Sequence, residues 1–212
     1  MTPVERARGH ETRRLWALAG GLGLMVGFLL LGLEAREGHM FAWDRAVWRF
    51  LHGHELHAQG SVFDRVANSM LDSGGTAAMV ILGIALVAIL LRSGRTQDAL
   101  FVVTAGTATL ALTPLLKEPF ERAELKYSFP SGHSAASSAL VAAAVIVAWP
   151  TRLRWVALVF GTLFAATLGT VLVYENWHLP SDVLGGWCVG VGCAVVARGV
   201  TAALARGRRR LS

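Results

Sequence analysis

Charged residues are scarce in this sequence. Asp, Glu, Lys and Arg make up 16% of the chain and hydrophobic residues make up 54%, whereas a soluble domain carries about 25% charged residues. Because the deficit is concentrated in long apolar stretches, the composition excludes an ordinary soluble protein and predicts an integral membrane protein. No stretch rich in Pro or Ser divides the chain, so we expect a single domain over residues 1–212.

Cysteine is nearly absent, and the two cysteines present do not predict a disulfide. Cys188 and Cys193 both lie in the last apolar stretch. Five residues apart on a helix, their side chains would point about 140° away from one another around the axis, which disfavours a bond. We therefore interpret both as small apolar residues of a helix bundle.

Acidic residues are also few. The 14 Asp and Glu residues stand against 20 Lys and Arg residues, which gives a formal net charge of +6. A basic protein can bind nucleic acid, but here the basic residues gather at the ends of apolar stretches, as they do in membrane proteins. We expect no nucleic-acid partner.

The apolar residues form six stretches, each close to the ~20 residues that a helix needs to cross the hydrocarbon core. Backbone groups in lipid must be paired within the segment, so these stretches predict helices rather than strands. They cover approximately residues 16–33, 75–91, 98–116, 134–149, 155–174 and 183–204. The predicted fold is an all-α bundle of six transmembrane helices with its core at about residues 75–204. The first stretch resembles a signal peptide but lacks a small-residue cleavage site, which favours a retained helix over a processed signal.

Glycine is frequent in the last of these stretches. Small residues let two membrane helices approach closely. The glycines expected to act in this way are Gly185, Gly186, Gly190 and Gly192.

The basic residues also predict how the bundle is oriented. In a six-span topology, the side that holds both termini carries 12 of the 20 Lys and Arg residues, and the other side carries 7. Since the cytoplasmic side carries the excess, both termini are predicted to be cytoplasmic, in a multi-pass protein of the plasma membrane. Residues 34–73 would then form an outer interfacial segment. Within it, "FAWDRAVWRFLHGH" has the spacing of a surface helix, and Trp43, Trp48 and Phe50 suit the lipid interface.

Two further segments on the outer side carry most of the polar residues that could perform chemistry. One reads "LLKEPFERAELKYSFPSGHS" and the other "VLVYENWHLPSDVLGG". The predicted topology places both on the same membrane face. Together they contain Lys117, Arg122, Ser131, Gly132, His133, His178 and Asp182.

Part of this set predicts an anion site. Ser131 and Gly132 come just before an apolar stretch, where the N–H groups at a helix N-terminus attract negative charge. Ser131 can cap the helix and donate to a phosphoryl oxygen, and Gly132 allows close approach of the backbone. Lys117 and Arg122 add positive charge, although Arg122 is also interpretable as a loop residue paired with a neighbouring glutamate.

The two histidines and the aspartate suit displacement at phosphorus. One imidazole can attack, the other can protonate the departing oxygen, and a carboxylate can hold the tautomer of the nucleophile. His178 and Asp182 are four residues apart, so Asp182 can reach back to His178. No acidic cluster suited to Mg²⁺ accompanies them, so we expect metal-independent chemistry without a cofactor.

"FPSGHS" together with "HLPSDVLGG" resembles the type 2 phosphatidic acid phosphatase (PAP2) superfamily. The resemblance implies a six-helix membrane fold and a phosphatase acting on a lipid phosphomonoester or diphosphate through a phosphohistidine. It implies His178 as the nucleophile, Asp182 as its partner and His133 as the general acid. The phosphate would be bound by Lys117, Arg122, Ser131 and the Gly132 amide. Substrates implied by the family are polyprenyl diphosphate, phosphatidic acid and phosphatidylglycerol phosphate.

The sequence departs from the family pattern at two arginine positions. Counting from Lys117, the first of these falls on Glu124, and counting back from His178, the second falls on Leu172. Each missing arginine would remove a charge-assisted hydrogen bond of about 1.5–3 kcal/mol.

Two alternative functions therefore stay open. The first is a lipid-binding protein on a phosphatase scaffold, weak or inactive in catalysis. The second is a phosphotransferase that passes the group to a lipid or sugar hydroxyl. The sequence does not predict an oligomeric state.

Overall fold

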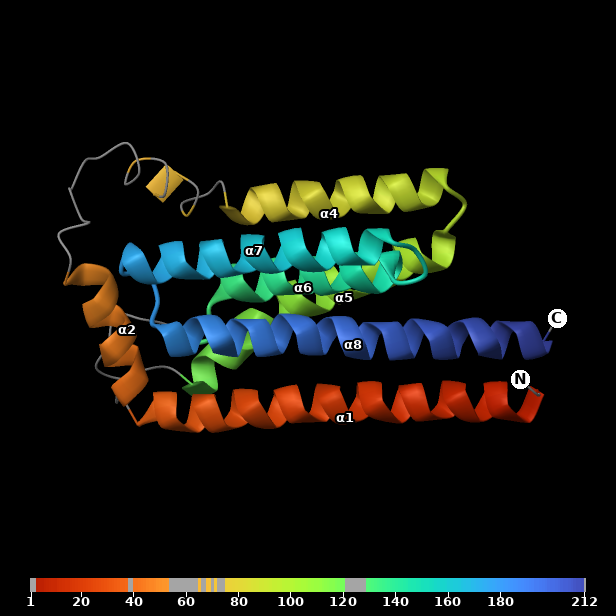
Figure 1. Cartoon of the computed structure of the whole chain (residues 1–212), viewed down its shortest axis with the longest axis horizontal. Helices are drawn as coiled ribbons and strands as arrows, with labels where there is room; N and C mark the ends of the chain where they lie inside the picture. Colours follow the sequence, from red (N-terminus) through yellow and green to blue (C-terminus); the bar gives the residue numbers. More distant parts are fainter. Residues whose placement is uncertain are drawn as a thin grey trace.

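The computed structural model of this chain is all-α in the residues it describes, which are 3–37, 40–53, 65, 68–69, 71, 75–120 and 129–211. The long helices lie side by side, and both ends of the chain are at the same end of the bundle (Figure 1). The helices are α1 (Pro3–Arg36), α2 (Ala42–His52), α4 (Gly75–Arg92), α5 (Thr96–Lys117), α6 (Gly132–Ala148), α7 (Leu153–Tyr174) and α8 (Pro180–Leu211), and the short 3₁₀ helix η2 (Glu118–Phe120) follows α5.

The all-α prediction is confirmed, and each of the six apolar stretches lies on one helix. Within the described residues, four helices are long and apolar enough to cross a membrane, namely those containing Ala19–Arg36, Thr96–Phe120, Leu153–Tyr174 and Pro180–Gly207. The apolar segments Ala77–Arg92 and Gly132–Ala148 are shorter. Six crossings and cytoplasmic termini therefore remain predictions.

Helices α6 and α8 begin two or three residues earlier than the apolar stretches that predict them. Consequently His133 is the second residue of α6, and Asp182 is the third residue of α8. Both candidate residues therefore belong to the first turns of helices and not to loops.

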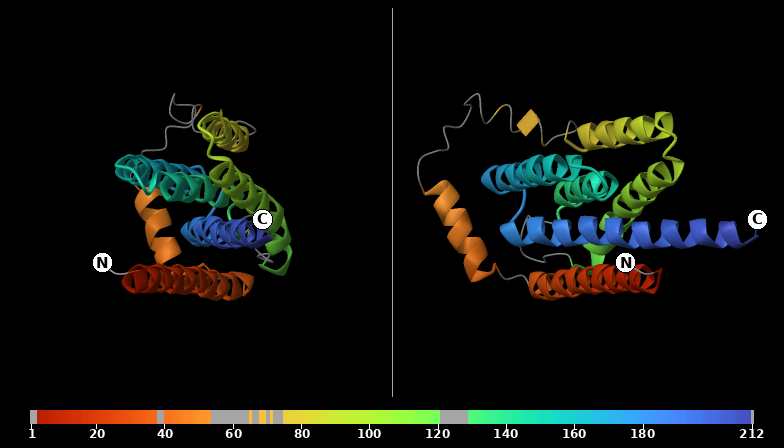
Figure 2. Two further views of the ribbon diagram at one scale, coloured as in Figure 1. Left: turned by 90° about the vertical axis from the view of Figure 1, so that its right-hand side faces the viewer. Right: turned by 45° about the vertical axis from the view of Figure 1, so that its right-hand side comes forward.

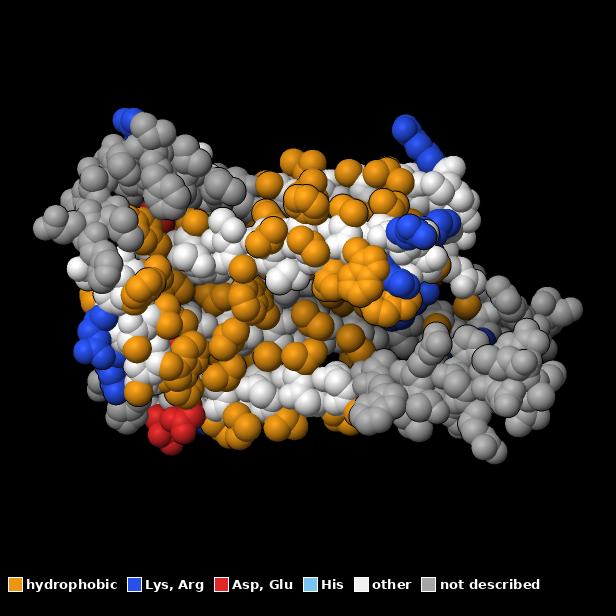
Figure 3. Space-filling view, in the orientation of Figure 1, with side chains coloured by type: hydrophobic (Ala, Val, Ile, Leu, Met, Phe, Trp, Pro, Cys, Tyr) orange, Lys and Arg blue, Asp and Glu red, His pale blue; other side chains and the backbone are white. Residues whose placement is uncertain are grey.

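The surface along the bundle is apolar. Large hydrophobic side chains are exposed on α1, α4 and α7, among them Leu30, Ile84 and Phe160. Figure 3 shows hydrophobic side chains across the middle of the bundle, with Lys and Arg side chains nearer its two ends. Because soluble monomers rarely expose apolar patches larger than a few hundred Å², this surface fits a protein embedded in lipid.

Helix α8 is central and packs against α1, α5 and α6. A Cβ atom on Gly186 would lie 2.5 Å from the Ser131 carbonyl oxygen, and one on Gly190 would overlap the Ala135 carbonyl oxygen and the Ser138 hydroxyl. Gly185 similarly leaves room for the Phe129 ring. The prediction of close packing through glycine is confirmed at these three positions.

The same prediction is wrong at Gly192, because a Cβ atom there would meet nothing within 4 Å. Residue 192 is buried, but an added Cβ atom would still fit there without a close contact. Its glycine is therefore not required for the contact between α6 and α8.

The charged residue inside the last apolar stretch, Arg198, is paired. Its Nη1 lies 2.7 Å from Asp98 Oδ1, and its guanidinium carbon is 5.3 Å from the centre of the Phe101 ring. Arg95 also contacts Asp98, at 2.8 Å, and donates to the Val147 carbonyl. This cluster ties α5, α6 and α8 together near the end of the bundle that carries both termini.

Helix α2 crosses the opposite end of the bundle, near the start of α8 (Figures 1 and 2). The predicted surface helix is confirmed as a helix, and Phe50 on it is 67% exposed. Trp48 is instead half-buried against the end of α7. Most of the predicted interfacial segment after residue 53 lies outside the described residues.

Candidate active site

Ser131 caps the first turn of α6. As the N-cap of this helix, it has extended backbone angles, and its Oγ accepts a hydrogen bond from the Ser134 N–H at 3.4 Å. The Ser134 hydroxyl also donates to the Ser131 Oγ, at 3.1 Å. Ser131 is completely buried, so its hydroxyl is held in a fixed place at the positive end of the α6 dipole.

The first turn of α8 holds the second part of the site. Asp182 is fully buried, and its Oδ2 accepts the Leu179 N–H at 2.8 Å. Leu179 directly precedes α8, and a carboxylate at the third position of a helix commonly accepts the N–H of the residue that precedes the helix. The same Oδ2 lies 3.6 Å from the His178 Nδ1. That distance exceeds a hydrogen bond, so the carboxylate faces the imidazole without bonding to it in this structure.

The two helix starts are joined directly. The Ser131 N–H donates to the Asp182 carbonyl oxygen at 2.9 Å. The glycines at the crossing of α6 and α8 allow this approach, because a side chain at residue 186 would collide with Ser131. The residue expected to bind phosphate and the residue expected to orient the nucleophile are therefore fixed relative to one another.

A cavity of about 420 Å³ opens where these elements meet the end of α5. Gly132 and His133 from α6, His178 from the link between α7 and α8, and Lys117 from α5 all line it. Trp177 lines it as well. The structure thus brings both candidate histidines, the candidate lysine and the candidate glycine to one cavity.

His133 and His178 both present ring nitrogens without a hydrogen-bond partner in the described part of the chain. These atoms are His133 Nε2 and His178 Nδ1, and both are buried. The His133 ring lies edge-on to Trp177, with 6.2 Å between ring centres, and within electrostatic range of His178 and Lys117. Buried polar atoms in a folded protein are normally paired. His178 Nδ1 faces the Asp182 carboxylate, so His133 Nε2 is the unpaired nitrogen left for a ligand of the cavity.

Gly132 leaves open space at the cavity. A Cβ atom on it would have Thr113 Cγ2 as its nearest neighbour, at 3.9 Å. Packing against the protein therefore does not explain a glycine at this position. The glycine leaves the backbone of residue 132 accessible from the cavity.

Arg122 and Glu124 lie outside the described residues, so the first departure from the family pattern has no structural description. The second does. Leu172 is fully buried in α7 among Leu71, Leu168 and Val183. An apolar core therefore occupies the place where the family pattern has an arginine, and Leu172 contributes only its carbonyl, which accepts the N–H groups of Trp177 and His178.

A residue that the sequence did not single out contacts the first turn of α8. Asp44 of α2 is fully buried, and its two carboxylate oxygens accept the Ser181 N–H and hydroxyl, each at 2.8 Å. The partners are 137 residues apart, so no local pattern could reveal the contact. The only available signal is an acidic residue among the aromatic residues of a short amphipathic helix.

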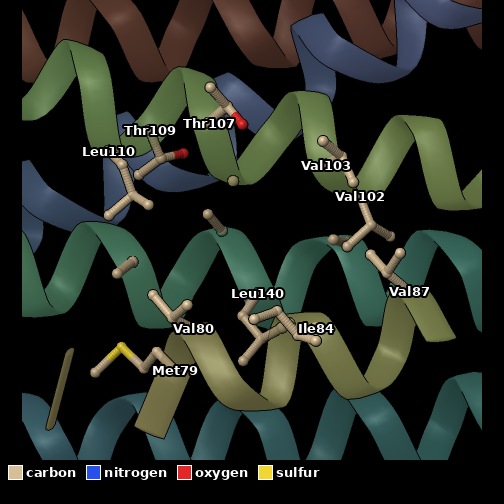
Figure 4. Close-up of a pocket in the computed structure, with 15 residues that line it drawn as sticks. Met79, Val80, Ile84, Val87, Val102, Val103, Thr107, Thr109, Leu110 and Leu140 are labelled. Carbon is tan, nitrogen blue, oxygen red and sulfur yellow. The ribbon is translucent and has the colours of Figure 1, made fainter. Parts of the chain in front are cut away.

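A second hollow adjoins the cavity. It has a volume of about 270 Å³, lies between α4, α5 and α6, and shares Thr109, Leu110 and Ala136 with the cavity of the two histidines. Figure 4 shows apolar side chains of all three helices around it, including Ile84 and Leu140. An apolar groove therefore leads away from the polar cavity.

No group of three or more His, Cys, Asp or Glu side chains placed to hold a metal ion occurs in the residues that the structure describes. The cavity is lined by two imidazoles and an ammonium group, whereas Ser131 and Asp182 are fully buried and are not among its lining residues. An ammonium group beside two imidazoles can bind a phosphate anion.

Comparison with known proteins gives one family and two solved structures. The model of the PAP2 superfamily matches residues 49–205. A PAP2 type phosphatidylglycerolphosphate phosphatase from Bacillus subtilis superposes with a TM-score of 0.62 at 22% identity, covering 85% of this chain and 94% of that one. LpxE from Aquifex aeolicus superposes with a TM-score of 0.54 at 19% identity, covering 75% of this chain and 96% of that one. No curated protein matches this sequence. At these identities the structural likeness supports the fold.

Proposed function

This chain belongs to the PAP2 superfamily, and on that premise we propose that it is an integral membrane phosphatase that removes phosphate from a lipid phosphomonoester or diphosphate. The family resemblance predicted from the two sequence motifs is confirmed by the match over residues 49–205. The observation that carries the proposal is the single cavity lined by His133, His178, Lys117 and Gly132.

In the proposed reaction, His178 is the nucleophile. Its Nδ1 faces Asp182, which leaves Nε2 to attack phosphorus while the carboxylate stabilises the positive charge that develops on the ring. The bond from phosphorus to the lipid oxygen breaks as the bond from phosphorus to nitrogen forms. The product of this step is a phosphohistidine.

His133 acts as the acid in the first step and as the base in the second. Its unpaired Nε2 gives a proton to the departing lipid oxygen. The same nitrogen then takes a proton from a water molecule that attacks the phosphohistidine. Inorganic phosphate leaves and both imidazoles return to their starting state.

The phosphoryl oxygens are bound by the start of α6 and by Lys117. The Ser131 hydroxyl, the Gly132 amide and the Lys117 ammonium group are the proposed donors, with Arg122 as a further cation. The start of α8 is less suited to this task, because Asp44 and Asp182 already accept its first N–H groups. The anion is thereby directed to α6.

The apolar groove supports a lipid as the substrate. A chain attached to a phosphate in the polar cavity would continue past Leu110 and Ala136 into the groove between α4, α5 and α6. The phosphate-bearing lipids expected from the sequence, namely polyprenyl diphosphate, phosphatidic acid and phosphatidylglycerol phosphate, all combine these two parts. The Bacillus subtilis structure with this fold is described as a phosphatidylglycerolphosphate phosphatase, which makes that lipid the first to be tried.

The cavity lies at the end of the bundle opposite both termini (Figure 1). With cytoplasmic termini, as the distribution of Lys and Arg predicts, the site would open to the extracytoplasmic side of the plasma membrane.

One observation favours a second candidate function. Leu172 fills an arginine position of the family pattern with an apolar side chain in the core. A protein that binds a phospholipid in the cavity and groove without releasing phosphate would tolerate this loss of positive charge.

Phosphate release by the purified protein tests both candidates. The assay uses detergent micelles with EDTA present and compares the three lipids, with His178→Ala and His133→Ala as variants. The phosphatase predicts release from at least one lipid that His178→Ala abolishes. Release that persists unchanged in both variants would overturn the assigned roles, and lipid binding without release would favour the second candidate.

A further inference from the structure

His178 is held in place mainly by its backbone. Its Nδ1 lies 3.6 Å from Asp182 and has no hydrogen-bond partner within the described residues. Its position therefore depends on the chain from the end of α7 to the first turn of α8. Contacts that hold this segment therefore also hold His178, the proposed nucleophile.

Helix α2 bonds to this segment on the C-terminal side of His178. Asp44 accepts both the N–H and the hydroxyl of Ser181, three residues after His178, and both residues are completely buried. A carboxylate at the start of a helix is favourable, because it satisfies an otherwise unpaired N–H and faces the positive end of the dipole. Ser181 is followed directly by Asp182, so the same contact also fixes the carboxylate that faces His178.

Helix α2 also bonds to this segment on the N-terminal side of His178. The Trp48 indole N–H donates to Asn176 Oδ1 at 2.7 Å, and the Asn176 amide donates to His52 Nε2 at 3.0 Å. Asn176 has a φ of +58°, a conformation that Asn tolerates better than most residues. This residue stands two positions before His178, so α2 holds the chain on both sides of the nucleophile.

From these contacts we propose that Asp44 is a positioning residue for the reaction: through Ser181 it holds the first turn of α8 so that Asp182 and His178 stay aligned. A second contact between α2 and this segment, formed by Trp48, His52 and Asn176, lies on the N-terminal side of His178. Helix α2 is thereby the part of the molecule that sets the geometry of the nucleophile, although none of its residues lines the cavity. The kinetic readout of this proposal rests on the proposed phosphatase function.

The test compares Asp44→Ala, Asp44→Asn, Ser181→Ala and the double variant Asp44→Ala/Ser181→Ala. A misplacement of about 1 Å at a reacting group can cost roughly 100-fold in rate, so Asp44→Ala is expected to lower kcat by about that factor with KM nearly unchanged. Asp44→Asn keeps one oxygen to accept the Ser181 N–H and should recover much of the loss. The double variant should be no worse than Asp44→Ala, because the two side chains act through one contact. Val47→Ala, a change at a partly exposed position on the same helix, is the matched control.

A second readout does not depend on turnover. Hydrogen exchange of the purified full-length protein, followed by mass spectrometry, should be faster at residues 176–183 in Asp44→Ala than in the wild type and Val47→Ala. Exchange near Asp98 and Arg198, at the other end of the bundle, should not change. Unchanged exchange at residues 176–183 overturns the proposal whether or not the protein releases phosphate.

The outcomes separate the proposal from the function on which it rests. A wild-type protein without phosphate release, but with the predicted change in exchange, contradicts the phosphatase and leaves Asp44 as the residue that holds the segment. Faster exchange with wild-type kcat contradicts the positioning role. If Asp44→Ala does not fold, Ser181→Ala, which keeps the backbone contact, must still lower kcat, and wild-type kcat in that variant overturns the proposal.

Discussion

The two histidines at the cavity differ in what surrounds each ring. His178 has a buried carboxylate beside its Nδ1, whereas His133 stands edge-on to Trp177 and within reach of Lys117. A carboxylate beside an imidazole stabilises the positive charge that forms when the ring attacks, and this favours His178 as the nucleophile. The His133 ring has no carboxylate beside it in the described residues; it bonds to the backbone of Leu71, and its Nε2 has no hydrogen-bond partner there.

Asp182 combines an electrostatic role with a structural one, and a substitution can separate them. Asp182→Asn keeps an oxygen that can accept the Leu179 N–H but removes the negative charge beside His178. We expect kcat to fall by roughly 10²- to 10⁴-fold, the range for loss of acid–base assistance, with little change in thermal stability. Asp182→Ala, measured alongside, should lose stability as well as activity. Wild-type kcat in Asp182→Asn would remove the carboxylate from the mechanism.

Gly132 offers a test of the anion site that does not alter a charged group. A methyl group added there meets only Thr113, at 3.9 Å, so Gly132→Ala should fold normally. If the phosphate lies against this backbone, the methyl group should raise KM about fivefold, as expected for loss of one hydrogen bond of about 1 kcal/mol. Inhibition by inorganic phosphate should weaken in parallel. An unchanged KM together with unchanged inhibition would place the phosphate elsewhere in the cavity.

At the scale of elements, the site depends on how closely α6 and α8 approach. Their crossing places the Ser131 N–H against the Asp182 carbonyl and leaves no room for side chains at residues 186 and 190. In a membrane, where apolar burial does not distinguish protein from lipid, small residues and close packing provide much of the attraction between helices.

Two glycines of α8 form a matched pair for testing this contact. Gly190→Ala forces a methyl group into the Ala135 carbonyl and the Ser138 hydroxyl and should destabilise the protein by about 1–3 kcal/mol, as overpacking does. Gly192→Ala meets nothing within 4 Å and should be neutral or stabilising, by up to about 1 kcal/mol, because Ala favours a helix. Thermal unfolding in detergent measures both. Equal unfolding temperatures for the two variants would contradict the proposed packing.

The sequence predicted the helices well because an apolar segment in lipid must pair its backbone N–H and C=O groups internally, as a helix does. It also predicted the histidines, Lys117 and Gly132 as neighbours, since their motifs fall on one side of a six-helix topology. It could not predict Asp44, whose partner is 137 residues away. Nor could it predict how Leu172 is accommodated, because only the packed structure reveals an apolar core around that position. Most helices begin before their apolar stretches, α1 by the largest margin, and at α6 the residue that caps the earlier start is Ser131.

At the scale of the whole molecule, function depends on which membrane face the cavity meets. The termini and the cavity lie at opposite ends of the bundle, and the excess of basic residues lies with the termini. The apolar groove runs from the cavity along α4, α5 and α6. A lipid could thus keep its chain in the membrane while its phosphate reaches His178.

Thiol labelling tests the orientation. In a background with Cys188 and Cys193 replaced by Ala, a single cysteine is introduced as Ala46→Cys in α2 or as Arg152→Cys between α6 and α7, both at exposed positions. A membrane-impermeant maleimide should label Ala46→Cys in intact cells and should label Arg152→Cys only after lysis. The reverse pattern would place the cavity on the cytoplasmic side and both termini outside.

The groove can be blocked without disturbing its surroundings. Gly83 and Gly106 both line it, and a Cβ atom on either meets nothing within 4 Å. Gly83→Leu and Gly106→Leu should lower kcat/KM for long-chain lipid phosphates much more than for a short-chain analogue. An equal effect on both substrates would show that the chain does not enter the groove.

The central claim is that His178 becomes phosphorylated, and the most direct measurement is to trap that intermediate. The wild type, His133→Ala and His178→Ala are mixed rapidly with ³²P-labelled p-nitrophenyl phosphate, whose phenolate leaves without help from an acid, and the protein-bound label is counted after alkaline quenching. His133→Ala should accumulate label that is stable to base, is released by acid and maps to residue 178, because the water that must resolve it lacks its base. His178→Ala should bind none. Phosphate release by the wild type with no label on any of the three proteins, or label retained in His178→Ala, would contradict the proposed mechanism.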